Sequence, residues 1–96
     1  MHFEVKAVHF TLHEETREYL ERKIGRIHNA ENMIIDLKIT LTKDKDFAAE
    51  ATVNFRWGVS VHLKENDFDL NPAIDKLIDK LEAKIIKEKE KVTEKR

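Results

Sequence analysis

Five lysines recur along the last third of the chain at spacings of three and four residues. They are Lys76, Lys80, Lys84, Lys87 and Lys91. If residues 70–91 form a helix, a rotation of about 100° per residue places all five on one flank of an apolar stripe. The acids Asp75, Asp79, Glu82 and Glu90 then fall on the other flank. Ammonium groups in a row contact phosphate oxygens, so the chemistry that this flank predicts is binding of an extended polyanion.

Sorting charges by sign destabilises an isolated helix. Lysines four residues apart repel each other by about 0.2–0.5 kcal/mol per pair. Partial relief is expected from Asp79, three residues after Lys76, and from the negative end of the helix dipole. The remaining cost favours a partner outside the chain, and a row about four turns long, or roughly 22 Å, fits a nucleic-acid backbone. The alternative is a solvated lysine-rich face, and the pattern alone favours neither.

A second group of cations lies in residues 13–29, which also have helical spacing. Arg22, Lys23 and Arg26 share one side with Tyr19. The acids Glu14, Glu18 and Glu21 lie on the opposite flank. If the two helices lie side by side, we expect their cations to form one continuous basic face with the acids turned away from it.

Composition excludes several other classes of function. The 96 residues carry a net charge of −1 and no cysteine, which removes disulfides and thiolate metal sites. His9 and His13 are four residues apart but straddle a strand end and a helix start, so no metal site is expected. The chain lacks G-x-S-x-G, P-loop and G-x-G-x-x-G motifs, and we predict neither catalysis nor a cofactor. No apolar run approaches the ~18–20 residues that span a bilayer, so a cytoplasmic protein without membrane contact is expected.

The elements that position these cations follow from the hydrophobic pattern. Alternation predicts strands over residues 2–9, 32–43, 47–55 and 59–64, with turns at 43–46, 56–58 and 65–72. The order strand, helix, three strands, helix predicts an α+β two-layer sandwich. Its four-stranded mixed sheet has a right-handed parallel crossover between the first two strands and carries both helices on one face. We expect one domain over residues 1–91 and a frayed basic tail over residues 92–96.

Individual side chains of the core are also predicted. In the second strand we expect Ile35, Leu37, Ile39 and Leu41 to point inward. The core stripe of the last helix is formed by Leu70, Ile74, Leu77, Leu81 and Ile85. Phe47, Phe55 and Phe68 are predicted to be buried. Trp57 lies in a turn, where it could stack on a base or fold back over the sheet edge; Gly58 can take a positive φ there.

The sequence resembles the ribosome hibernation promoting factor family, also called ribosome-associated inhibitor A, protein Y or sigma-54 modulation protein. The resemblance is carried by FAAEATVN (residues 47–54), a glycine-containing turn and DFDLNPAIDKLIDKLEAKIIKEKEK (residues 67–91). TLHEETREYLERKIGRI (residues 11–27) resembles the first helix of that family. Ala83 departs from the pattern, because an arginine is usual there, and Lys84 follows it as a partial replacement.

The resemblance implies a partner and a mechanism. It implies that the chain binds the small ribosomal subunit and its rRNA, occupies the channel of mRNA and of the A- and P-site tRNAs, and blocks translation in stationary or stressed cells. The expected rRNA-binding residues are Arg22, Lys23, Arg26, Lys80, Lys84, Lys87 and Lys91, to which the helix pattern adds Lys76. The chain resembles the short form, a monomer off the ribosome, so ribosome pairing would require a separate ribosome modulation factor.

A different class of function remains open from the residues. The long last helix could serve as a protein-interaction or dimerisation module. Its contact residues would be Ile78, Ile86 and Val92. Ile86 lies off the core stripe, which supports this alternative.

Overall fold

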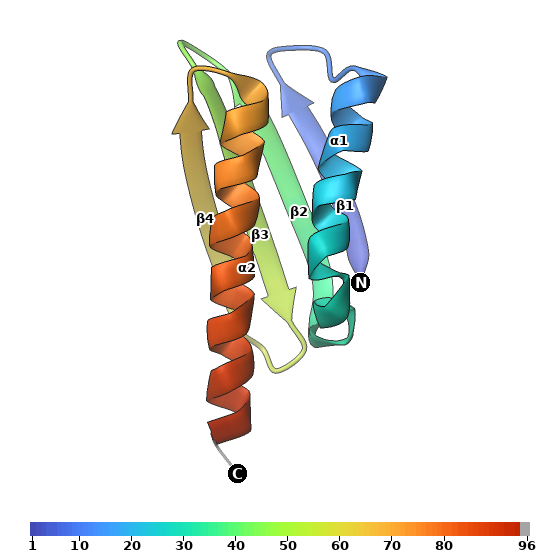
Figure 1. Ribbon diagram of the computed structural model, residues 1–96, viewed down its shortest axis with the longest axis vertical. Helices are drawn as coiled ribbons and strands as arrows, with labels where there is room; N and C mark the ends of the chain where they lie inside the picture. Colours follow the sequence, from blue (N-terminus) through green and yellow to red (C-terminus); the bar gives the residue numbers. More distant parts are fainter. Residues whose placement is uncertain (95–96) are drawn as a thin grey trace.

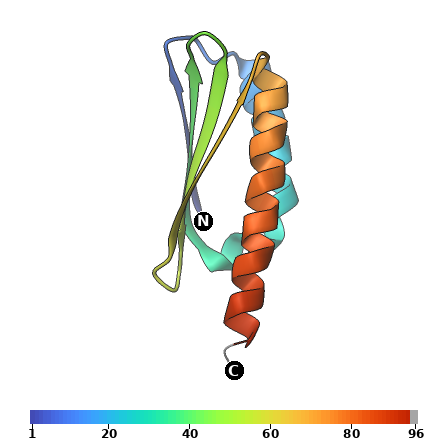
Figure 2. The ribbon, with the colours of Figure 1, turned by 90° about the vertical axis from the view of Figure 1, so that its left-hand side faces the viewer.

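The computed structural model describes residues 1–94, and the side chains of all of these except residues 28, 29 and 92–94. One sheet contains β1 (His2–Val8), β2 (Ile34–Lys43), β3 (Phe47–Phe55) and β4 (Ser60–Asp67) in that order. β1 is parallel to β2, and the other neighbours are antiparallel. Helices α1 (Glu14–Ile24) and α2 (Leu70–Glu94) run side by side over one face of the sheet (Figures 1 and 2). The predicted α+β sandwich is therefore confirmed.

The core lies between the sheet and the helices. Leu37, Ile39 and Leu41 of β2 are at most 1% exposed, as are Ala49, Ala51, Val53 and Phe55 of β3. α2 contributes its buried stripe to the same cluster: Ala73, Ile74, Leu77, Ile78, Leu81 and Ile85. Leu70, at the predicted start of this stripe, is only partly buried. The stripe fixes how α2 is rotated about its axis and thereby which neighbour each of its charged flanks faces.

The first helical segment differs from its prediction as one helix over residues 13–29. The α-helix ends at Ile24, and a 3-10 helix, η1 (Gly25–Met33), continues to the start of β2. A 3-10 helix has three residues per turn, so residues at steps of three share one face. Ile24, Ile27 and Ala30 follow this step and are at most 7% exposed. The spacing of these apolar residues favours the tighter helix, which extends past residue 29.

β2 contains an irregularity that overturns the prediction for Ile35. The pairing with β3 shifts in register between Ile34 and Asp36, so Ile35 is left out of the ladder. Ile34 is fully buried instead, whereas Ile35 is 50% exposed. A bulge of this kind inserts one residue and turns its side chain away from the expected face.

Two predictions near the connection between β4 and α2 are also wrong. β4 extends to Asp67, because pairing with β3 continues as far as Phe47 opposite Asp67, so residues 65–67 are strand and not turn. Phe68 lies just beyond this pairing and is 80% exposed, so it is not a core residue. Phe55 is buried as predicted, and Phe47 is partly buried against the core.

The C-terminal helix is longer than predicted. α2 continues to Glu94, three residues beyond the expected boundary at residue 91. Residues 95 and 96 of the predicted tail lie outside the described residues. None of the helices in the described part of the chain is long and apolar enough to cross a membrane.

The bulge predicts unequal effects for the truncation of two aliphatic residues of β2. Leu37→Ala should lower the free energy of unfolding by about 2–5 kcal/mol, because a fully buried side chain is replaced by a cavity. Ile35→Ala, two positions earlier, should change it by only about 0.5 kcal/mol, as at other exposed sites. Urea denaturation of both variants measures this. Equal losses at the two positions would contradict the observed register.

Candidate nucleic-acid interface

The lysine flank of α2 faces β4. Lys76 Nζ lies 2.8 Å from Asp67 Oδ2 and donates to the carbonyl oxygen of Asn66 at 3.3 Å. Lys80 Nζ lies 2.8 Å from Glu65 Oε2 and 3.4 Å from the carbonyl oxygen of Lys64. Both lysine side chains remain about half exposed, at 51% and 48%. The ammonium groups are therefore paired within the chain but accessible from solvent.

These pairs shift the pKa of the groups involved. The hydrogen bond from Lys80 lowers the pKa of Glu65, and the hydrogen bond from Lys76 lowers the pKa of Asp67. Asp67 also accepts the backbone N–H of Asp69 at 3.1 Å, where the chain turns into α2. In return, Asp67 raises the pKa of Lys76. These shifts all favour the charged forms of Glu65, Asp67 and Lys76 at neutral pH.

Further along α2, one buried carboxylate holds two more lysines. Glu88 is 3% exposed, and its Oε2 lies 3.2 Å from Lys91 Nζ and 3.9 Å from Lys84 Nζ. Its Oε1 accepts the indole N–H of Trp57 at 3.4 Å. Burial raises the pKa of Glu88, but the hydrogen bonds from Lys91 and Trp57 outweigh this effect, and the pKa lies below its ordinary value. This carboxylate joins the β3–β4 turn to the C-terminal half of α2.

The acidic flank of α2 faces the other helix. Lys23 Nζ lies 3.3 Å from Asp75 Oδ1, to which Tyr19 also donates its hydroxyl hydrogen at 2.5 Å. This hydrogen bond raises the pKa of Tyr19. Beyond Ile24, Arg26 at the start of η1 contacts Glu82 Oε1 at 2.6 Å and Asp79 Oδ1 at 3.4 Å. Lys23 and Arg26 are thus neutralised by the acids of α2.

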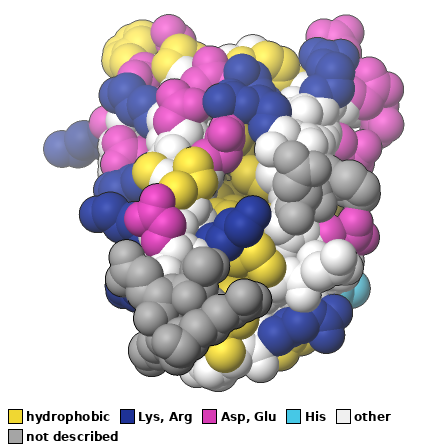
Figure 3. Space-filling model, turned by 60° about the horizontal axis from the view of Figure 1, so that its bottom comes forward, with side chains coloured by type: hydrophobic (Ala, Val, Ile, Leu, Met, Phe, Trp, Pro, Cys, Tyr) yellow, Lys and Arg dark blue, Asp and Glu magenta, His cyan; other side chains and the backbone are white. Residues whose placement is uncertain are grey.

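The expectation of one continuous basic face with the acids turned away is therefore wrong. Packing of the core stripe points the acids of α2 into the interhelical seam and its lysines toward β4. Lys23 and Arg26 therefore lie on one flank of α2, and the lysines of α2 lie on the other. Figure 3 shows Lys and Arg side chains interspersed with Asp and Glu side chains. The like-charge cost within α2 is also offset inside the chain, so it does not by itself require an external partner.

Two of the candidate cations lack an ion pair with the side chains that the structure describes. Lys87 is exposed on α2, next to the buried Glu88. Arg22 is exposed on α1, and its guanidinium carbon lies 5.9 Å from the centre of the Tyr19 ring. Neither cation must leave a carboxylate in order to reach a phosphate.

The carboxylates Glu65, Asp67 and Glu88 were missed by sequence reasoning. The alternation of side chains along β4 could have predicted the positions of Glu65 and Asp67. Val61 and Leu63 point toward the helices, and steps of two continue that face through Glu65 to Asp67. Glu88 has no such signal, because its partner Trp57 is remote in the sequence.

His62 and Trp57 are both engaged in contacts within the fold. His62 Nδ1 lies 3.0 Å from the hydroxyl of Thr52, the residue directly opposite it in the pairing of β3 with β4. Among the described side chains, no group of three or more His, Asp or Glu could hold a metal ion. Trp57 is folded back onto Phe55, with ring centroids 5.0 Å apart and planes at 19°.

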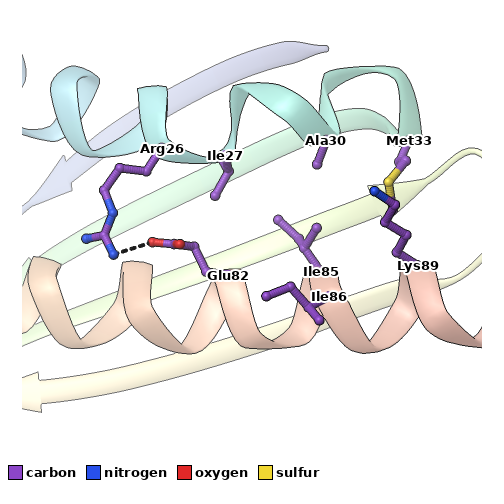
Figure 4. A pocket seen from close by; sticks show the side chains of 8 residues that line it. All are labelled: Arg26, Ile27, Ala30, Met33, Glu82, Ile85, Ile86 and Lys89. Atoms are coloured by element: carbon purple, nitrogen blue, oxygen red, sulfur yellow. Dashed lines mark ion pairs between the residues drawn. The ribbon is translucent and has the colours of Figure 1, made fainter.

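A cleft of about 240 Å³ lies between the two helical segments (Figure 4). Ile27, Ala30 and Met33 of η1 line one wall, and Ile85 and Ile86 of α2 line the other. Ile86 is 57% exposed, which fits the alternative of a protein-interaction helix. Ile78 does not fit it, because this residue is fully buried in the core. The side chain of Val92 lies outside the described residues.

Comparison with known proteins identifies the family. Residues 3–93 match the model of the family described as sigma 54 modulation protein / S30EA ribosomal protein. The chain belongs to this family. The ribosome hibernation promoting factor of Azotobacter vinelandii is 35% identical over 79 residues, which is 81% of this chain and 73% of that protein. The resemblance seen in the residues is thus confirmed, and proteins of the S30EA family are binding and modulating proteins, not enzymes.

Solved structures share the fold of this S30EA chain. The N-terminal domain of Thermus thermophilus Protein Y gives a TM-score of 0.77 at 27% identity, over 88% of this chain and 96% of that one. A ribosomal subunit interface protein from Coxiella burnetii gives a TM-score of 0.84 at 24% identity, over 93% and 98% of the two chains. The second likeness establishes the fold alone.

The Glu88 cluster makes a prediction about pH. Glu88→Gln should lower the free energy of unfolding by about 1.5 kcal/mol at pH 7, because charge-assisted hydrogen bonds are lost. The folded-state pKa of Glu88 lies below the unfolded value of about 4.3, so this contribution is present above that pH and disappears as the pH falls through the folded-state pKa. Denaturation of wild type and variant between pH 3 and 7 measures the difference.

The matched control is Glu90→Gln, an exposed glutamate on the same helix. It should have little effect at any pH in this range. A loss for Glu88→Gln that is the same at pH 3 and at pH 7 would show that its charge does not contribute.

Proposed function

We propose that this chain is a ribosome-associated hibernation factor that binds the small subunit and occludes the path of mRNA and tRNA. The family match over residues 3–93 carries the proposal, and the name of the Azotobacter vinelandii relative agrees with it. The mechanism is steric, and contacts between cations and rRNA phosphates supply the affinity. No bond is made or broken.

The lysine flank of α2 supports this proposal through its exposure and its weak internal pairing. Ion pairs between exposed side chains contribute about 0–1 kcal/mol each. A phosphate can therefore replace Glu65 beside Lys80, or Asp67 beside Lys76, at little cost to the fold. Lys87 is available without any exchange. Lys84 and Lys91 border the buried Glu88 and can contact phosphate while they remain near that carboxylate.

The cations of the first helical segment have different roles in the proposed interface. Arg22 is exposed and free of ion pairs within the described side chains, so it contacts phosphate directly. Lys23 and Arg26 first hold the acids of α2 in the interhelical seam. Their contribution to rRNA binding is smaller, because leaving the seam would expose Asp75, Asp79 and Glu82 to the same phosphates.

A second candidate function is a protein-interaction or dimerisation module based on the interhelical cleft. The exposed Ile86 and the apolar walls of the cleft favour it. Such an interface would associate in a concentration-dependent manner that salt does not weaken, because apolar burial is not screened. A monomer that binds small subunits in a salt-sensitive manner opposes it.

Replacement of three lysines by glutamine tests the rRNA-binding flank. The variant combines Lys80→Gln, Lys84→Gln and Lys87→Gln. Its co-sedimentation with small subunits at ~0.1 M salt should fall at least tenfold, because three phosphate contacts are lost. Glutamine is preferred to glutamate, since a new carboxylate would face Glu65 or Glu88. Circular dichroism checks that the fold is retained.

The matched control removes three charges elsewhere. It combines Lys6→Gln, Lys38→Gln and Lys45→Gln, which replace exposed lysines on the open sheet face and in the β2–β3 turn. This variant should keep nearly all of its binding. Equal losses in the two triple variants would mean that total charge, not the α2 flank, determines binding.

The pairing of Lys80 with Glu65 predicts a gain of affinity. Glu65→Gln should tighten binding to small subunits about two- to fivefold, because phosphate no longer competes with a carboxylate for the Lys80 ammonium group. Glu14→Gln makes the same change in net charge at the exposed start of α1 and should leave the affinity nearly unchanged. A titration monitored by filter binding compares the three proteins. If both variants gain equally, the carboxylate of Glu65 is not a specific competitor.

A further inference from the structure

A second hollow lies where the β3–β4 turn meets the C-terminal half of α2. It has a volume of about 380 Å³ and is lined by Trp57, Val59, Ser60, Val61, Lys84, Glu88 and Lys91. This size is within the range of small-ligand sites. The lining residues from the turn and β4 are mostly apolar or aromatic, whereas those from α2 are charged.

The indole of Trp57 is held in a fixed plane at this hollow. Phe55, which is itself buried, stacks against the ring. The indole N–H is directed to Glu88 Oε1. Trp57 nevertheless remains 37% exposed, so part of its ring surface is open to solvent. A ring fixed in this way presents a stacking surface without a further loss of side-chain freedom.

The charges beside the indole indicate which kind of flat group would stack there. Lys84 and Lys91 stand on the α2 wall, both within 4 Å of the Glu88 carboxylate. Since Glu88 is buried and the lysine side chains are 31% and 63% exposed, the ammonium groups are the accessible part of this cluster. A group with an aromatic face and an adjoining negative charge matches the hollow, and a nucleotide of a single-stranded RNA has both.

We infer that this hollow binds an unstacked base of single-stranded RNA on Trp57, with the adjoining phosphate at Lys84 or Lys91. The inference rests on the proposed function and extends the RNA-binding surface from the helices to the β3–β4 turn. Stacking of a base on an aromatic side chain tolerates any base, so the site adds affinity without selecting a sequence.

Two substitutions of Trp57 separate stacking from a structural role. Trp57→Phe keeps an aromatic face but loses the donor to Glu88, whereas Trp57→Leu keeps apolar bulk without an aromatic face. If a base stacks here, the affinity for small subunits should fall less than threefold in the first variant and about tenfold in the second. Phe68→Leu, which removes an exposed aromatic ring elsewhere, should bind as wild type does. Indistinguishable affinities for the two Trp57 variants would overturn the inference.

Fluorescence provides a readout that does not require ribosomes, because Trp57 is the sole tryptophan of the chain. Its emission should be quenched by saturating hexaadenylate but not by an abasic phosphodiester hexamer of equal charge. Saturation is monitored by the anisotropy of a labelled strand. Equal responses to both oligomers, or no response to either, would overturn the inference even if Trp57→Leu weakens subunit binding. If wild type fails to bind small subunits, the proposed function fails, whereas the quenching experiment still decides the ligand of the hollow.

Discussion

Burial of the apolar stripe of α2 is the constraint on which the rest of the structure depends. Ile74, Leu77, Ile78 and Leu81 are fully buried, so α2 cannot rotate about its axis without exposing them. Burial of each such side chain stabilises the fold by about 1.5–3 kcal/mol, more than any one surface ion pair. The charged flanks therefore follow from the core: acids face α1 and η1, and lysines face β4.

The electrostatic arrangement has a double consequence. Lys76 and Lys80 are matched by carboxylates of β4, whereas Lys84 and Lys91 pair with Glu88 of α2 itself. These contacts relieve the repulsion between like charges along the helix. The same carboxylates of β4 compete with any phosphate that approaches the lysines. The net charge of −1 agrees with such internal matching. In the proposed interface, binding to a polyanion would depend on the local exchange of partners and not on an overall positive field.

Much of the fold could be predicted from periodicity, and the errors have physical causes. Alternation of apolar residues located the strands, and helical spacing located the core stripe of α2. The bulge at Ile35 and the 3-10 geometry of η1 were missed because both change the period locally. The candidate cations were found from their spacing, but their partners were not. Contacts such as those of Lys80 with Glu65 and of Trp57 with Glu88 depend on tertiary packing, which helix geometry alone does not specify.

The most direct test of the account is the salt dependence of binding to the small ribosomal subunit. If Arg22 and the five lysines of the α2 flank each contact a phosphate, the logarithm of the association constant should fall with the logarithm of salt concentration with a slope of about −4 to −5.5. A slope near zero, with binding that persists at high salt, would contradict an interface based on cations and phosphates.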